Sequence, residues 1–152
     1  MLRRLVHVET LEGFNKILVR TIDEVLRYSL GDRTVEIFYD YLRRKGFILS
    51  KIPQDPDFFF EELRKILEFE GYGMRFRRVS GIGIVSILER TVIEVLCKKF
   101  GLEFNEKGPI IFSEWVEKVR ETYIIKHSKL RLNSRNGGEN CREEGQHFSG
   151  GR

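Results

Sequence analysis

The chain has 152 residues, of which 41% are hydrophobic and 33% charged, which suits one globular domain with a core of its own. It has no apolar run of about 18 residues and no signal peptide, so we expect a cytoplasmic protein without a membrane span. The formal charge of +4 divides into +3 for residues 126–152 and +1 for residues 1–125. A basic balance held mostly by the tail is weak support for a nucleic-acid surface.

Five stretches carry apolar residues at the three- and four-residue steps of amphipathic helices. They span residues 10–30, 33–45, 56–69, 84–100 and 114–126. We therefore predict an all-α fold, a single compact bundle of four to five helices over residues 8–126. Residues 74–79 could add a short extended segment. Residues 127–152, rich in Asn, Gly, Ser, Arg and Glu, are predicted to be a disordered basic tail.

Local signals predict where these helices begin and end. Thr10 can cap the first helix, and Gly31 can stop it. Asp32 can cap the second helix, and Ser113 the last. The strongest start signal is Asp55–Asp57, in which an Asp cap precedes Pro at the first helical position and a second Asp near the positive end of the dipole.

The run Phe58-Phe59-Phe60 follows that start signal directly. Three adjacent rings point in three directions on a helix, so at least two of them need neighbours to pack against. The run predicts helices packed around aromatic residues.

The stretch between the third and fourth helices combines glycines, arginines and aromatic residues. With the outer rings of the third helix it predicts a contact patch for a protein partner of unknown identity. The members are Phe58, Phe60, Tyr72, Arg75, Phe76, Arg77 and Arg78. The alternative is nucleic-acid binding, because such arginines can meet phosphates while the rings stack on bases. That alternative predicts binding that falls steeply as salt rises.

A third hypothesis is small-ligand or nucleotide binding at the Gly81–Gly83 turn. The sequence Gly81-Ile82-Gly83 resembles an incomplete dinucleotide fingerprint, with Ser86 in place of the third glycine. Glu89, on the apolar fourth helix, is the carboxylate that such a site would use; otherwise it forms a salt bridge to Arg90 or to a neighbouring helix.

No pattern of catalytic residues, cofactor binding or metal ligation stands out. Histidine, the commonest general base and metal ligand, does not occur between residues 8 and 126. Cys97 and Cys141 form no Cys-x-x-Cys pair, so two reduced thiols are expected. We therefore expect a protein that is not an enzyme.

The order of several motifs resembles a small helical domain family of archaea, described as an output domain of the Nitrosopumilus type. The motifs are Leu26-x-x-x-Leu30-Gly31, Ile37-Phe38-Tyr39-Asp40-Tyr41-Leu42, Ile52-Pro53-x-Asp55-Pro56-x-Phe58-Phe59 and Leu88-Glu89-Arg90-x-x-Ile93-x-x-Leu96. The resemblance covers about residues 10–102, and the stretch Gly71–Ser80 is longer here than that family's short glycine turn. It implies an all-helical archaeal domain tied to signalling or regulation, without catalytic residues.

Overall fold

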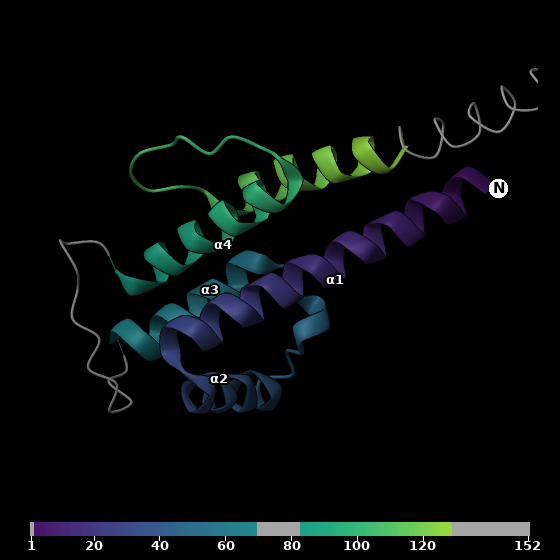
Figure 1. Ribbon diagram of the computed structural model, residues 1–152. Helices are drawn as coiled ribbons and strands as arrows, with labels where there is room; N and C mark the ends of the chain where they lie inside the picture. Colours follow the sequence, from purple (N-terminus) through teal and green to yellow (C-terminus); the bar gives the residue numbers. More distant parts are fainter. Residues whose placement is uncertain (1, 70–82, 129–152) are drawn as a thin grey trace, which may run out of the picture.

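The computed structural model describes residues 2–69 and 83–128, and every regular element in these ranges is helical (Figure 1). The elements are α1 (Leu2–Leu30), α2 (Asp32–Arg44), the 3-10 helix η1 (Leu49–Lys51), α3 (Pro56–Arg64), the π-helical turn η2 (Lys65–Phe69) and α4 (Ile84–Phe100). A last helix follows at residues 112–128 and is named here by its range. The predicted all-α bundle is confirmed, whereas residues 74–79 and 129–152 lie outside the described ranges.

Helix α1 is the element around which the others pack. It contacts α4, α2 and η1, and Figure 1 shows α2 on one side of it and α4 with the 112–128 helix on the other. Its buried face recurs at three- and four-residue steps through Phe14, Leu18, Ile22 and Leu26. Within the described ranges, no helix combines the length and apolarity that a membrane crossing needs.

The first helix begins well before the predicted residue 10, so Thr10 lies inside it and is not its cap. The part of α1 at Gly13 and Phe14 makes a contact that is distant in sequence. The rings of Phe14 and Tyr123 lie 5.7 Å apart, and a Cβ on Gly13 would stand 2.8 Å from the Tyr123 hydroxyl. Helix α1 therefore packs here against the 112–128 helix, which a local cap signal cannot reveal.

The predicted helix boundaries at Gly31 and Asp55 are confirmed, whereas the predicted caps Asp32 and Ser113 are not. Gly31 has φ +84° and separates α1 from α2, as only glycine does readily. Gly31 also occupies the N-cap position of α2, while Asp32 accepts a hydrogen bond from Arg27 instead of capping. The Asp55 cap is confirmed, since its carboxylate accepts from the amide of Phe58 at 3.2 Å. The last helix begins at residue 112, so Ser113 lies within it.

The three consecutive phenylalanines of α3 each contact a ring from a different segment. The ring-centroid distances are 5.1 Å for Phe58–Phe47, 5.2 Å for Phe59–Phe38 and 4.6 Å for Phe60–Phe112. Offset and edge-on ring pairs at such distances add stability beyond their buried area. The predicted packing of helices around this run is therefore confirmed, and all three rings take part.

A buried carboxylate joins α2 to α3. Glu62 is 3% exposed and accepts hydrogen bonds from the hydroxyl of Tyr41 at 2.8 Å, from Lys45 at 2.9 Å and from Lys65 at 3.0 Å. Burial alone raises the pKa of Glu62, but these three donors outweigh it and lower the pKa to about 2. The carboxylate is therefore ionised at neutral pH and ties the two helices together.

Candidate functional site

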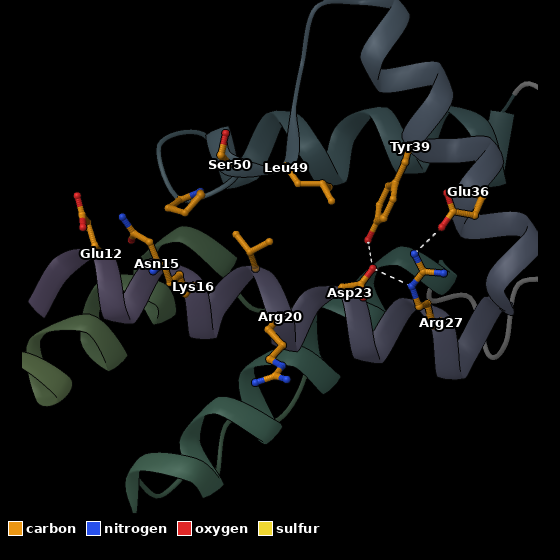
Figure 2. A pocket seen from close by; sticks show the side chains of 12 residues that line it. Glu12, Asn15, Lys16, Arg20, Asp23, Arg27, Glu36, Tyr39, Leu49 and Ser50 are labelled. Atoms are coloured by element: carbon orange, nitrogen blue, oxygen red, sulfur yellow. Dashed lines mark hydrogen bonds and ion pairs between the residues drawn. The ribbon is translucent and has the colours of Figure 1, made fainter. Parts of the chain in front are cut away.

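A groove of about 780 Å³ lies between α1, α2 and the η1 region, and we call it the α1–η1 groove (Figure 2). Helix α1 forms one long wall, and Leu49 and Ser50 face it from η1. The lining residues are Glu12, Asn15, Lys16, Val19, Arg20, Asp23, Arg27, Glu36, Tyr39, Leu49, Ser50 and Pro53.

The lining is apolar in the middle and polar along the edges. Val19, Tyr39, Leu49 and Pro53 are half-buried or buried and supply the apolar part. A second hollow of about 270 Å³ adjoins it, because Tyr39 and Leu49 line both hollows. The exposed side chain of Ile48 lies at this second hollow. Eight of the twelve lining residues are polar or charged, and the other four supply the apolar floor. Binding sites combine apolar surface with polar groups that orient the ligand.

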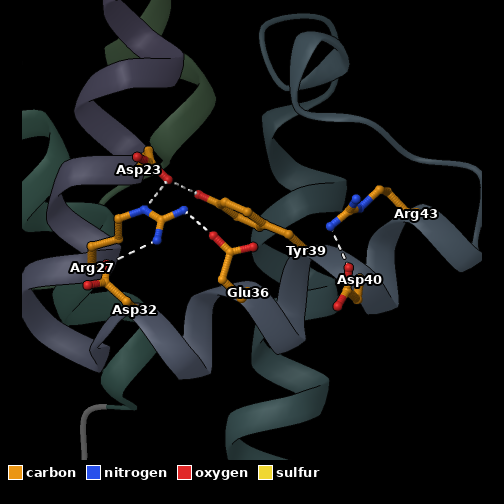
Figure 3. A network of polar contacts seen from close by, with 7 residues as sticks. All are labelled: Asp23, Arg27, Asp32, Glu36, Tyr39, Asp40 and Arg43. Atoms are coloured by element: carbon orange, nitrogen blue, oxygen red, sulfur yellow. Dashed lines mark hydrogen bonds and ion pairs between the residues drawn. The ribbon is translucent and has the colours of Figure 1, made fainter.

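Asp23, Arg27 and Glu36 line one end of the groove, and Asp32 also pairs with Arg27 beside it (Figure 3). We call this group of three carboxylates and one guanidinium the acidic end. The guanidinium donates to Asp23 and Asp32 at 3.0 Å each and to Glu36 at 2.6 Å. Hydrogen bonds to Glu36, Asp32 and Asp23 raise the pKa of Arg27, so it stays charged. Three carboxylates and one guanidinium leave a formal charge of −3 + 1 = −2.

Tyr39 connects this end to the apolar floor. Its hydroxyl donates to Asp23 at 2.7 Å, across the space between α2 and α1. Burial raises the pKa of Tyr39 far above its usual value, and the bond to Asp23 raises it further. The phenol therefore remains a protonated donor that holds the wall in place.

The opposite part of the groove carries cations. Lys16 and Arg20 lie one turn apart on α1, and we call them the basic rim. The side chain of Arg20 is 81% exposed and reaches Glu24 only at 3.6 Å. Between this rim and the end of the groove at Glu12 lies Asn15, whose buried Oδ1 has no hydrogen-bond partner among the described residues.

The structure places the predicted contact patch only in part. Phe60 is 2% exposed and packs on Phe112, so its predicted role as a partner contact is wrong. Phe58 is half-buried against Phe47. The remaining members, Tyr72 and residues 75–78, lie outside the described residues.

The Gly81–Gly83 turn is described only at Gly83, which has extended backbone at the N-cap of α4. Glu89 pairs with Arg64 of α3 at 3.1 Å, which is the interhelical salt bridge that the sequence left open. Cys97 is buried in the core, and this burial raises the pKa of its thiol. Among the described residues, no three potential metal ligands gather at one place.

No motif on α1 predicts the α1–η1 groove. Its wall on α1 contains one apolar residue, Val19, among charged and amide side chains, and this reads as an ordinary solvent-facing stripe. The groove exists because the chain after α2 crosses back over α1 at Leu49–Lys51, a long-range contact. A short apolar connector such as Phe47-Ile48-Leu49 between two helices is the only local hint of that return.

Comparisons of the chain with protein-family models, with curated proteins and with solved structures found no match.

Proposed function

We propose that this chain is a non-enzymatic, regulatory interaction module that binds a segment of a partner protein in the α1–η1 groove. The observation that carries the proposal is the groove itself, about 780 Å³ with an apolar floor between polar edges. Sites that bind apolar groups of ligands or peptides have this composition. The resemblance of residues 10–102 to an archaeal output domain supports the regulatory role.

The length of the groove favours a polypeptide as its occupant. Its wall on α1 extends from Glu12 to Arg27. At a helical rise of about 1.5 Å per residue these ends are about 22 Å apart. A helix of about four turns fits that length, and the adjoining hollow at Ile48 offers room for a second apolar side chain.

The proposal is tested with peptides of about 15 residues, the length of a 22 Å helix, selected from a random displayed library against the full chain. Val19→Lys places a long charged side chain on the apolar floor. Ile87→Lys, at an exposed position of α4, is the matched control. We expect the selected peptides to bind wild type and Ile87→Lys equally and Val19→Lys at least about tenfold more weakly. Equal binding to all three proteins, or no selected peptide, would contradict the proposal.

A further inference from the structure

We infer that the occupant of the α1–η1 groove is an amphipathic helix with a basic residue at one end, which pairs with the acidic end, and an acidic residue over the basic rim. This inference rests on the proposed function and adds the chemistry of the partner. It follows from the backbone around the groove, from the charges that line it and from their spacing.

The first step is the secondary structure of the occupant. The wall on α1 is a helix, and the facing wall combines Glu36 and Tyr39 of α2 with Leu49, Ser50 and Pro53 of the η1 region. None of the residues that line the groove belongs to a β-strand. An extended segment would bury its own N–H and C=O groups there without a sheet edge to pair with. A helix satisfies its backbone internally and can direct one apolar stripe onto Val19, Tyr39 and Leu49.

The second step is the cation on the occupant. Three carboxylates share a single guanidinium at the acidic end, which leaves a net formal charge of −2. The side chains of Asp32 and Glu36 are 80% and 55% exposed, so a partner's cation can approach them from solvent. A Lys or Arg at that position would complete the charge balance and set the direction in which the helix lies.

The third step is the carboxylate on the occupant. Lys16 and Arg20 line the same wall as the acidic end, further toward the start of α1. Arg20 reaches Glu24 only at 3.6 Å and both side chains are largely exposed, so Lys16 and Arg20 present cations here, in contrast to the carboxylates of the acidic end. The basic rim lies seven to eleven residues before Arg27, which is about two to three helical turns. The occupant's acidic and basic residues should therefore be about two to three turns apart.

The inference is tested with the peptides selected for the α1–η1 groove. We expect them to carry Lys or Arg at one end and Asp or Glu about two to three turns away, with bulky apolar residues between. Glu36→Lys should weaken their binding by about tenfold, and replacing the peptide's basic residue by Glu should restore most of it. Glu114→Lys, at an exposed position of the 112–128 helix, is the control and should change nothing.

The two failures are distinguishable. If Val19→Lys abolishes binding but Glu36→Lys does not, the groove binds peptides and the charge pairing is wrong. If Val19→Lys has no effect, the proposed function itself fails. Light scattering of the full chain measures whether it is a monomer or a dimer. A dimer that dissociates on Val19→Lys would overturn the inference, because a second copy of the chain would then be the occupant.

Discussion

The lowered pKa of Glu62 gives this carboxylate a stability effect that acidification can reveal. Its pKa is about 2 in the folded chain, against an ordinary value of 4.5. A carboxylate with a lowered folded pKa contributes stability above its unfolded pKa, and this contribution is lost as pH falls toward the folded pKa. The difference corresponds to about 3 kcal/mol in full, most of it lost between about pH 6 and pH 2.5.

The perturbation is Glu62→Gln, which keeps the shape of the side chain and removes its charge. The free energy of unfolding is measured by urea titration at several pH values, followed by the fluorescence of Trp115, the only tryptophan. At neutral pH the variant is less stable than wild type, because Lys45 and Lys65 lose their charged partner. The gap between the two proteins should narrow by about 2–3 kcal/mol on going from about pH 6 to pH 2.5.

Glu61→Gln is the matched control, since Glu61 is the exposed neighbour of Glu62 on α3. This variant should keep the wild-type loss of stability on acidification. A gap between Glu62→Gln and wild type that stays constant across this pH range would refute the reasoning. It would mean that Lys45, Lys65 and Tyr41 do not outweigh the burial of the carboxylate.

Two further predictions concern a packed ring and a buried amide oxygen that has no donor among the described residues. Phe60→Ala should lower the free energy of unfolding by about 3–5 kcal/mol, because the ring is buried against Phe112, and half-buried Phe58→Ala should cost clearly less. Urea titration compares the two, and equal losses would contradict the assignment of Phe60 to the core. Asn15→Ala should raise the free energy of unfolding by about 1 kcal/mol, because it removes a buried acceptor without a donor and improves helix propensity. A loss of stability on this substitution would show that the amide has a partner.

Local signals in the sequence were sufficient for most of the helix boundaries. Asp55 accepts the capping hydrogen bond that Asp-Pro predicts. Gly101, after the predicted last residue of the fourth helix, adopts φ +70° and ends α4. Such signals act over a few residues, so they are readable without knowledge of the fold.

Features that depend on contacts between distant segments could not be predicted from local sequence signals. The packing of Gly13 and Phe14 against Tyr123 joins residues that are more than a hundred positions apart in sequence. The end of the third helix widens into a π-helical turn at Lys65–Phe69, where an uninterrupted α-helix was predicted. The burial of Phe60 depends on Phe112, which a helix pattern over residues 56–69 cannot include.

The α1–η1 groove also depends on contacts between segments that are distant in sequence. Asp23, Arg27 and Glu36 have unremarkable positions in sequence, and their convergence with Tyr39 depends on how α2 folds back on α1. The sequence predicts a contact surface formed by the outer rings of α3 together with Tyr72, Arg75, Phe76, Arg77 and Arg78, because aromatic residues and arginines often mark interfaces. The rings of Phe58 and Phe60, which lie among the described residues, pack against Phe47 and Phe112. The α1–η1 groove lies on another side of the bundle.

Amide chemical-shift mapping of the full chain with a selected peptide tests the binding groove most directly. We expect the largest shifts at residues along α1 from Glu12 to Arg27 and at Leu49 and Ser50, with Val19→Lys needing a peptide concentration at least about tenfold higher for the same shifts. Shifts concentrated at residues 71–83 or on the 112–128 helix, with the groove unchanged, would contradict the account and place the binding surface elsewhere.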